Sequence, residues 1–558
     1  MLKIVECVPN FSEGRDRSII DAIAKAIQDT DGVKLLDVDP GADTNRTVIT
    51  FIGTPEGVKE AAYQAIKRAA ELIDMRQHKG AHARIGATDV CPFVPVAGVT
   101  MADCVAIARE VGQRVAETLD IPVYLYEAAA TRPERQSLAN IRSGEYEGLP
   151  EKLRDPNWLP DFGAAQFNPR SGATVIGARE FLIAYNVNLN TRDKRLAHDI
   201  ALTIRETGRN KRDATGNFVR DEDGNIVKEP GLLPATRAVG WYIDEYGQAQ
   251  VSINLLNYKI TPPHIAFDTI CAEAEKRGLR VTGSELVGLI PLAAMLDAGR
   301  YYLLKQGKSP GVSEEELIET AIVSLGLRDL TEFDPQKKII EYQVRELKGP
   351  LVRKDLRDFA NAVSSDSPAP GGGSVSALAG ALGAALTAMV ANLTVGKKDY
   401  DAFWEEMKTV AIHAQQYKDE LLRAVDRDTE AFNQVMAAFA LPKKSADQMA
   451  QREQAVEQAT KNACLVPLDV MKNALEVLKL ARIVADSGNA NAVSDAGVAA
   501  LTALTAVQGA GLNVKINLPG IKDRAFVDQM NAEVKRITDD AVALQQQVLE
   551  IVHSKIAV

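Results

Sequence analysis

The sequence RQHKGAHARIG, residues 76–86, leads directly into DVCPFVPV, residues 89–96. The second string is an apolar, β-branched run that predicts a buried strand, and the glycines at 80 and 86 predict a bent loop before it. Two imidazoles, His78 and His82, stand among basic groups in this loop. Basic groups suit an anionic substrate, and imidazole exchanges protons near neutral pH. The loop is therefore a candidate catalytic segment.

Two other interpretations of this loop were weighed. A solvated basic loop is one alternative, because loops collect both charge and function. A His-x-x-x-His metal pair would need a continuous helix and further ligands, and Gly80 disfavours that helix.

On either side of the loop, residues up to about 179 alternate β-branched runs with amphipathic helical stretches, which indicates an α/β fold. A second set of strands and helices begins with FLIAYNVNL, residues 181–189. Residues 238–244 and 249–256 predict a β-hairpin, with Gly247 able to take positive φ in the turn. Residues 216–229 are polar and rich in turn residues, which predicts an exposed loop or hairpin. The sequence contains no short tandem repeat that would signal a solenoid.

Beyond residue 355 strong helix formers with recurrent apolar positions replace the strand patterns, which predicts a helical bundle. A charged segment with a Gly-Pro pair precedes this change and predicts a linker. The expected divisions are an N-terminal subdomain at 1–179, a second subdomain at 180–344, a linker at 345–352 and a helical domain at 353–558.

Composition limits the class of protein. A chain of 558 residues with 46% hydrophobic and 25% charged residues is ordinary for a globular protein of several domains. Its net charge of -10 gives no bulk attraction to nucleic acid. Local basic groups must therefore bind any anionic substrate.

The expected location is cytoplasmic and the expected number of membrane spans is zero. The five cysteines are scattered without metal-ligand spacing, which favours reduced thiols, and the amino terminus does not read as a secretory signal. Ser374–Leu393 is uncharged and long enough to cross a bilayer, but it is mostly alanine and glycine. That weak hydrophobicity predicts a buried bundle helix.

Longer strings resemble one enzyme family. VECVPNFSEGR (5–15), LDVDP (36–40) and TNRTV (44–48) resemble the glutamate formiminotransferases, and APGGGS (369–374) resembles formiminotetrahydrofolate cyclodeaminase. In this order, over essentially the full chain, they resemble the bifunctional formiminotransferase-cyclodeaminases. The resemblance implies a two-subdomain α/β transferase followed by an all-α cyclodeaminase.

In that family the first half transfers the formimino group of N-formimino-L-glutamate to N5 of tetrahydrofolate. The family's catalytic histidine matches His82, whose neutral imidazole is expected to accept the N5 proton during attack on the amidine carbon. Asp39 is expected to orient that imidazole or hold the amidinium; capping of the turn before Pro40 is the alternative.

Three other side chains in or near the histidine loop each have two possible roles. His78 positions substrate or faces solvent. Arg46 and Arg84 either grip substrate carboxylates through paired donors or form surface ion pairs.

Two stretches resemble the family's folate-binding segments. Their glycines would let the backbone approach a flat pterin, and the alternative is that both are ordinary connecting loops. The residues are Gly163, Ala164, Ala165, Gln166, Phe167, Asn168, Pro169, Arg170, Ser171 and Gly172, and then Gly231, Leu232 and Leu233.

In the second half of the family, N10 of 5-formiminotetrahydrofolate attacks the amidine carbon, ammonia leaves, and 5,10-methenyltetrahydrofolate forms. The family's acid/base residue aligns with Asp428, in a predicted helix where Asp426 and Glu430 share a different face. Pattern alone predicts solvated carboxylates, whereas a bundle pocket would raise the pKa of Asp428. Asp495 is a secondary candidate. PGGGS at 370–374 predicts a folate or carboxylate contact at a helix start, or simple close packing.

The resemblance also implies partners. Tetrahydrofolate is expected as co-substrate, with the length of its glutamate tail left open, and no metal or redox cofactor is expected. A homo-oligomer with dimer contacts in both halves is expected. The alternatives are a formimino or formyl transferase whose helical half serves only oligomerisation, and a folate-binding scaffold without turnover.

Overall fold

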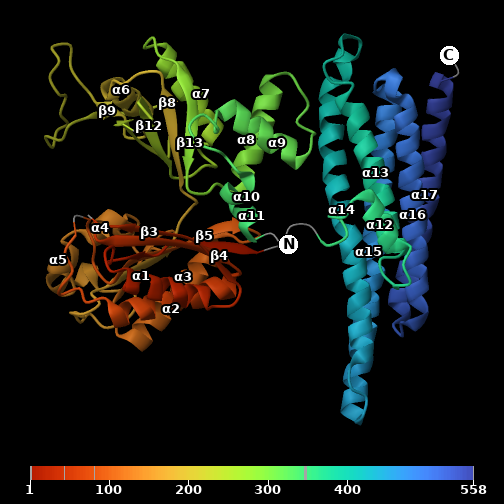
Figure 1. Ribbon diagram of the computed structural model, residues 1–558, viewed down its shortest axis with the longest axis horizontal. Coiled ribbons are helices and arrows are strands. Elements are labelled where there is room, and N and C mark those ends of the chain that lie inside the picture. The colour runs from red at the N-terminus through yellow and green to blue at the C-terminus, as the bar shows by residue number, and fades with distance from the viewer. Residues whose placement is uncertain (1–2, 43, 81, 245, 345–348, 557–558) are drawn as a thin grey trace. The chain divides into compact units, whose positions relative to one another are not determined.

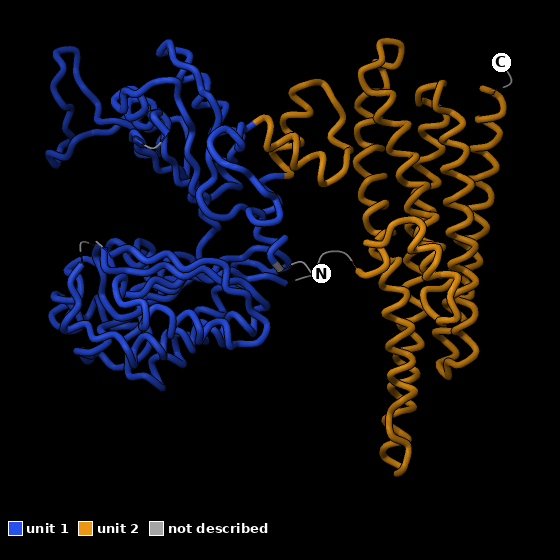
Figure 2. Tube along the Cα trace, viewed as in Figure 1, with its two compact units in different colours: residues 1–295, 325–345 blue, residues 296–324, 346–558 orange. Residues whose placement is uncertain are grey.

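The computed structural model describes residues 3–42, 44–80, 82–244, 246–344 and 349–556. The chain divides into two compact units (Figure 2): Met1–Met295 with Leu325–Arg345, and Leu296–Ser324 with Glu346–Val558. The first unit mixes strands and helices and the second is helical. This confirms the predicted fold class.

A seven-stranded sheet forms the first part of unit 1 (Figure 1). The strands run in the order β1-β4-β2-β5-β7-β6 with β3 beside β4; β7 pairs in parallel with β5 and β6, and the other pairings are antiparallel. Three helices, α1 to α3, cover one face and bury the apolar core with it. The predicted strand at 89–96 is β5, so the histidine loop enters the middle of the sheet.

The elements of this part are β1 (Ile4–Cys7), β2 (Asn10–Phe11), α1 (Arg17–Gln28), β3 (Val33–Gly41), β4 (Arg46–Gly53), α2 (Pro55–Leu72), β5 (Thr88–Ala97), α3 (Met101–Leu119), β6 (Val123–Glu127), α4 (Leu138–Arg142), α5 (Glu145–Lys152) and β7 (Thr174–Ala178).

A separate four-stranded sheet, in the order β11-β12-β8-β13, forms the second part of unit 1. The predicted hairpin is confirmed as β11 and β12, and Gly247 in its turn has φ +63°. The elements between residues 183 and 344 are β8 (Ile183–Leu189), α6 (Lys194–Ile204), β9 (Arg209–Asn210), β10 (Lys228–Glu229), β11 (Thr236–Ile243), β12 (Gln248–Leu255), α7 (Pro263–Glu275), β13 (Val281–Val287), α8 (Leu292–Lys305), α9 (Glu314–Leu325), α10 (Pro335–Lys338) and α11 (Ile340–Val344). Most of α8 and α9 belongs to unit 2.

Residues 211–228 form an arm between β9 and β10 that contains a repeat missed by the sequence analysis. RDATGNFV (212–219) is followed at once by RDEDGNIV (220–227). In each copy the arginine Nη1 donates to the glycine carbonyl four residues later at 2.6 Å, and the aspartate Oδ1 accepts from the asparagine N–H at 2.9 or 2.8 Å. The two copies are not a solenoid array, so the expectation of no repeat that would signal a solenoid is not contradicted. Each copy forms one turn, and neither contributes to a hydrophobic core. The sequence of the arm therefore shows no periodic pattern of apolar residues.

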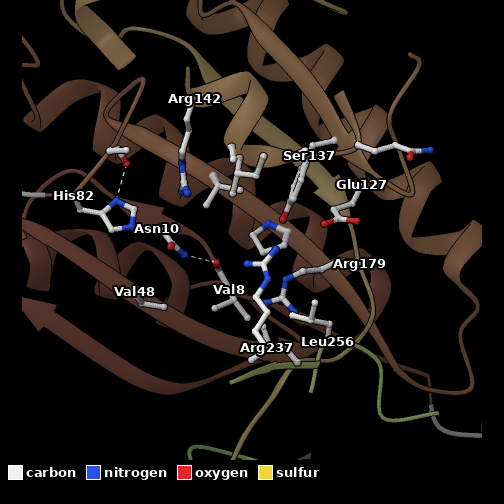
Figure 3. Close-up of a pocket in the computed structure, with 18 of the residues that line it drawn as sticks. Val8, Asn10, Val48, His82, Glu127, Ser137, Arg142, Arg179, Arg237 and Leu256 are labelled. Carbon is white, nitrogen blue, oxygen red and sulfur yellow. Dashed lines mark hydrogen bonds between the residues drawn. The ribbon is translucent and has the colours of Figure 1, made fainter. Parts of the chain in front are cut away.

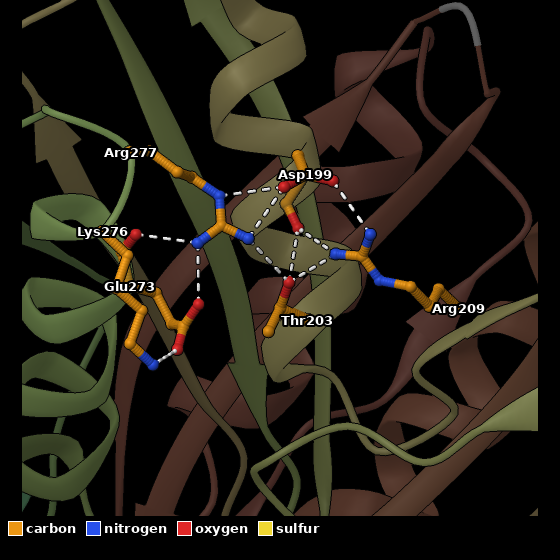
Figure 4. A network of polar contacts seen from close by, with 6 residues as sticks. All are labelled: Asp199, Thr203, Arg209, Glu273, Lys276 and Arg277. Carbon is orange, nitrogen blue, oxygen red and sulfur yellow. Dashed lines mark hydrogen bonds and ion pairs between the residues drawn. The ribbon is translucent and has the colours of Figure 1, made fainter.

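The base of this arm is fastened by a network of charged groups (Figure 4). Asp199 on α6 pairs with Arg209 at 3.1 Å and with Arg277 at 2.8 Å. Arg277 also pairs with Glu273 on α7 at 2.7 Å. Because Arg209 begins β9, the network ties the start of the arm to both helices of this layer.

The helical unit packs through small residues. An ideal Cβ at Gly383 would lie 2.9 Å from the Ala499 carbonyl oxygen, and one at Gly380 would lie 3.1 Å from the Ala506 Cβ. The alanine- and glycine-rich helix α13 therefore approaches α16 closely. The helices are α12 (Leu356–Val363), α13 (Gly372–Asn392), α14 (Trp404–Ala440), α15 (Ala446–Ser487), α16 (Val493–Asn517) and α17 (Arg524–Ile556).

Two stretches of the described chain are long and apolar enough to cross a membrane: Gly372–Asn392 and Ala490–Gly520. Their most apolar windows are 61% and 50% buried inside the protein. Length and composition alone are weak evidence for a span, because a core helix of a bundle has the same properties.

The expected second subdomain, 180–344, is divided between the two units. Leu296–Ser324 belongs with the helices. The Asn392 Nδ2 donates to the Gly311 carbonyl at 2.8 Å, and a Cβ at Gly311 would lie 2.4 Å from that of Ala411. This close backbone approach has no sequence signature. Residues 345–348 of the expected linker lie outside the described residues. Independent folding of the expected domains stays a prediction.

Candidate active sites

A cavity of about 1070 Å³ in unit 1 is lined by residues from both of its sheets. Its walls combine apolar side chains such as Val8, Val48 and Pro92 with arginines and one histidine. Figure 3 shows His82 and Asn10 at one end, and Glu127, Arg179 and Arg237 at the other. An apolar groove with a few convergent charged groups is the usual form of a small-molecule site.

His82 is held in one tautomer by its own loop. Its Nδ1 lies 2.6 Å from the Ala83 carbonyl oxygen. A carbonyl oxygen can only accept, so Nδ1 carries the hydrogen and donates, and Nε2 keeps its lone pair. Burial, followed by the charge of Arg46, lowers the pKa of His82 below 6.5. A neutral imidazole with a free Nε2 is a proton acceptor at neutral pH.

Arg46 is the cation beside this imidazole. It begins β4 and lines the cavity, and its Nε is buried without a hydrogen-bond partner among the described residues. Burial lowers its pKa from the usual 12.5. A buried donor without a partner costs free energy, and an anion bound in the cavity would satisfy it. Arg46 is therefore a candidate anion-binding residue.

Asp89 and Arg142 fix the end of the histidine loop. Asp89 is fully buried, accepts the Ile85 N–H at 3.0 Å and forms an ion pair with Arg142. Arg142 lines the cavity, and its charge also lowers the pKa of His82. The sequence analysis missed this pair, because the two residues are separated by 53 positions and form no motif.

His78 and Arg84 serve a different network. The His78 Nε2 donates to the Asn45 carbonyl at 2.8 Å, and its Nδ1 accepts from the Arg84 Nε at 3.2 Å. Arg84 is buried and pairs with Glu145 and Glu147 at 2.8 and 2.7 Å. Both ring nitrogens of His78 are therefore engaged, and two carboxylates already neutralise Arg84. Neither side chain is available to substrate in this arrangement.

Asp39 lies inside β3, opposite Val48, and Pro40 continues the same strand, so Asp39 does not cap a turn there. Its side chain is exposed, and the Ala83 carbonyl occupies the His82 Nδ1 that Asp39 was expected to orient. Its charge acts on Arg46 instead. Pro40 is tolerated in this strand because β3 is at the sheet edge, where a missing N–H breaks no ladder.

The first segment that resembles a folate site forms the loop before β7, and none of residues 163–172 lines the cavity. Residues 163–166 are exposed, while the far end of the loop is fixed to the back of the histidine loop. Gly172 has φ +68°, and an added Cβ would lie 2.2 Å from the Ile85 carbonyl oxygen. Only glycine fits there, so this glycine has a packing role in addition to any contact with ligand.

The second such segment, Gly231–Leu233, lies in the other layer against α6. The Leu232 and Leu233 N–H groups donate to the Thr203 and Ile204 carbonyls at 3.1 and 2.9 Å. Leu232 is 56% exposed and Leu233 is buried. The cavity is lined by neither segment, so the structure does not bring them together with His82.

Asp428 lies on α14 against the first turn of α13. It accepts a long hydrogen bond from the Ser374 Oγ at 3.4 Å. A Cβ added to Gly373 would lie 2.1 Å from the Asp428 Oδ1, so glycine is required for this approach. Burial raises the pKa of Asp428 above 3.8, and the Ser374 hydrogen bond opposes that shift. The carboxyl group is suited to exchange protons.

The neighbouring carboxylates have other roles. Asp426 is 7% exposed and accepts the Leu351 and Val352 N–H groups at 2.8 and 3.3 Å, so the expected solvated face was wrong at this position. Glu430 is exposed, as expected.

Asp495 is placed far from Asp428. It lies in the first turn of α16, whose Ala499 meets Gly383 near the middle of α13. Asp428 meets Gly373 at the start of α13. Ten helical residues, from 373 to 383, already span about 15 Å, and Asp495 lies a further turn beyond Ala499. Within one chain the two carboxylates do not share a site.

A metal-binding cluster of three or more His, Cys, Asp or Glu side chains is not found in the described part of the chain. Asn10, Glu127, Arg179 and Arg237 line the cavity and were not predicted. Tertiary folding brings them together from β2, β6, the end of β7 and β11, and no spacing in the sequence signals it.

Comparison with known proteins gives three matching family descriptions. Residues 4–179 match "Formiminotransferase domain, N-terminal subdomain", residues 184–345 match "Formiminotransferase domain", and residues 355–536 match "Formiminotransferase-cyclodeaminase". Formimidoyltransferase-cyclodeaminase of Gallus gallus is 45% identical over 558 residues and covers 100% of both chains.

Each half also has relatives that stand alone. Glutamate formimidoyltransferase of Streptococcus pyogenes serotype M1 is 43% identical over 303 residues, covering 54% of this chain and 94% of that one. Methenyltetrahydrofolate cyclohydrolase of Methylorubrum extorquens is 40% identical over 201 residues, covering 36% and 97%.

The fold and the sites together define a fused protein. Its α/β half has a cavity with an imidazole and arginines, and its helical half has a partly buried carboxyl group. The full-length matches make the assignment more specific. The chain belongs to the formimidoyltransferase-cyclodeaminase family.

Proposed function

We propose that the α/β half transfers the formimino group of N-formimino-L-glutamate to N5 of tetrahydrofolate. The observation that carries this proposal is the His82 tautomer, whose free Nε2 faces a cavity lined by arginines. N5 attacks the amidine carbon and passes its proton to Nε2. The imidazolium returns that proton to the departing amine, and glutamate leaves. Arg46 binds a donor carboxylate beside the reacting carbon.

The helical half then closes the ring. N10 attacks the same amidine carbon, Asp428 accepts the N10 proton and protonates the departing nitrogen, and ammonia leaves to give 5,10-methenyltetrahydrofolate. A carboxyl group with a raised pKa is suited to both transfers because its proton affinity is closer to that of the nitrogens with which it exchanges a proton. Folate is consumed as a co-substrate, and neither step formally requires a change of oxidation state.

The proposal extends to assembly and location. A homo-oligomer with a dimer contact in each half is supported, in the helical half, by exposed apolar side chains at heptad spacing on α13: Val375, Leu382 and Met389. A cytoplasmic location is supported by the scattered cysteines, none of which is in a disulfide in the described chain. Gel filtration of the two halves tests the first point.

One assay separates the candidate functions. The purified protein is mixed with N-formimino-L-glutamate and tetrahydrofolate, and glutamate, ammonia and methenylfolate absorbance are followed together. We expect all three to appear, glutamate first. Glutamate without ammonia would identify a transferase whose helical half serves only assembly. Folate binding without either product would identify a scaffold.

A further inference from the structure

Two arginines lie at the end of the cavity away from His82 (Figure 3). Arg179 directly follows β7 in the seven-stranded sheet, and Arg237 is the second residue of β11 in the four-stranded sheet. Both guanidinium groups act on Glu127, whose pKa each of them lowers. They are therefore close neighbours, although they come from different sheets.

Neither guanidinium has an ion-pair partner among the described residues. The Arg179 Nη1 donates to the Glu180 carbonyl at 3.0 Å, while the Glu180 carboxylate pairs with Lys259 at 3.0 Å. By contrast Arg142, which also lines the cavity, forms an ion pair with the Asp89 carboxylate. Arginines that line a cavity without a carboxylate partner are suited to a planar anion with two oxygens.

The local acids do not cancel these charges. Burial raises the pKa of Glu127, and burial raises the pKa of Glu6, on β1, to about 7. Arg179 opposes both shifts. Even with Glu127 ionised, two guanidinium groups face its single carboxylate, and the Glu180 carboxylate is paired with Lys259, so positive charge is in excess at this end of the cavity.

We propose that Arg179 and Arg237 form a subsite for a glutamyl carboxylate. This rests on the proposed function, in which the donor is a glutamate derivative and the folate tail ends in glutamate. The shared chemistry is the carboxylate. A carboxylate held by one arginine from each sheet also ties the two layers of unit 1 together when substrate is bound.

The subsite is remote from the reacting carbon, so it contributes equally to the bound substrate and the transition state. Removing it is expected to raise KM while leaving kcat nearly unchanged. A loss of general-base catalysis would instead lower kcat. An effect on KM therefore identifies a binding subsite, whereas an effect on kcat identifies a catalytic residue.

The test compares Arg237→Gln with Arg195→Gln. Arg195 lies on α6 of the same layer with its side chain 86% exposed, outside the cavity, so its replacement removes one positive charge and leaves the cavity intact. KM is measured for N-formimino-L-glutamate and for tetrahydrofolate with one or several glutamyl groups. We expect Arg237→Gln to raise one KM by about 10-fold or more, because charge-assisted hydrogen bonds are lost.

The substrate whose KM rises identifies the source of the carboxylate, donor or folate tail. Equal KM values for Arg237→Gln and Arg195→Gln would overturn the subsite.

Binding without turnover separates this inference from the proposed function. Glutarate and p-aminobenzoyl-L-glutamate are added as carboxylate ligands, and their binding is measured as an increase in the melting temperature of the protein. The parent and Arg195→Gln are expected to be stabilised by at least one probe, and Arg237→Gln by neither. An inactive parent that keeps this pattern would refute the transfer reaction alone. An active parent stabilised equally with and without Arg237 would refute the subsite alone.

Discussion

Burial shifts the pKa values of His82 and Asp428 in opposite directions. Burial lowers the pKa of the His82 imidazole and raises that of the Asp428 carboxyl group. The physical cause is the same, since leaving water disfavours whichever form is charged. The imidazole becomes a neutral base and the carboxyl group becomes a better proton carrier. One solvation effect thus prepares two different proton-transfer groups in one chain.

The largest expected effect comes from His82→Ala. Loss of the general base should slow formimino transfer by about 10²–10⁴-fold. Cyclisation of supplied 5-formiminotetrahydrofolate should be unchanged, because Asp428 acts in the other unit. In the parent, kcat/KM for transfer should rise with pH through a value below 6.5 and then level off, as His82 loses its proton. Transfer at the parental rate in the variant would remove His82 from the mechanism.

Asp428→Asn should have the reciprocal effect. The amide cannot accept and return a proton, so ammonia release should fall by at least about 10²-fold while glutamate release continues. The matched control is Glu430→Gln, an exposed carboxylate two residues further along α14. Asp426→Asn is unsuitable as a control because Asp426 accepts two buried N–H groups. Equal ammonia rates in Asp428→Asn and Glu430→Gln would contradict the assignment.

A milder change tests the geometry of the helical site. Gly373→Ala places a Cβ 2.1 Å from the Asp428 Oδ1, whereas Gly372→Ala meets the Asn513 side-chain amide at 3.2 Å. The first should displace the carboxyl group and slow cyclisation by roughly 10-fold, less than the loss of about 10²-fold that a misplacement of 1 Å can cause. The second should be nearly neutral. Rates of ammonia release in the two variants measure the difference, and matching rates would show that the approach of Asp428 to α13 is not needed.

The last prediction concerns stability and leaves both reactions unchanged. Burial raises the pKa of Glu6 to about 7 from 4.5, and Arg179 opposes the shift. The folded state therefore binds this proton more tightly, and its contribution to stability is present below pH 4.5 and is lost as the pH rises through 7.

Glu6→Gln removes this pH dependence. At pH 8 it should stabilise unit 1 by up to about 3 kcal/mol relative to the parent, and the advantage should shrink toward pH 4.5. Thermal unfolding of both proteins at several pH values measures it. An advantage that grows toward acid pH would show that Glu6 is ionised in the fold.

Local patterns in the sequence predicted the elements well. Apolar alternation predicted β5, and a glycine between two apolar runs predicted the β11–β12 hairpin. Helical periodicity predicted the long helices of the second unit. These features depend on neighbours within one strand or one turn of helix, so the sequence contains their cause.

The sequence by itself also determined where the two proton-transfer candidates, His82 and Asp428, stand in the chain. The family resemblance favoured His82 over His78, but the residues alone did not show the physical reason, because that depends on which carbonyl or guanidinium each ring nitrogen meets. It did not show that Asp426 is buried, or that Arg179 and Arg237 lie together. Those facts are contacts between residues separated by many positions. Only tertiary packing brings such groups within hydrogen-bond distance and removes the water that would otherwise set their pKa values.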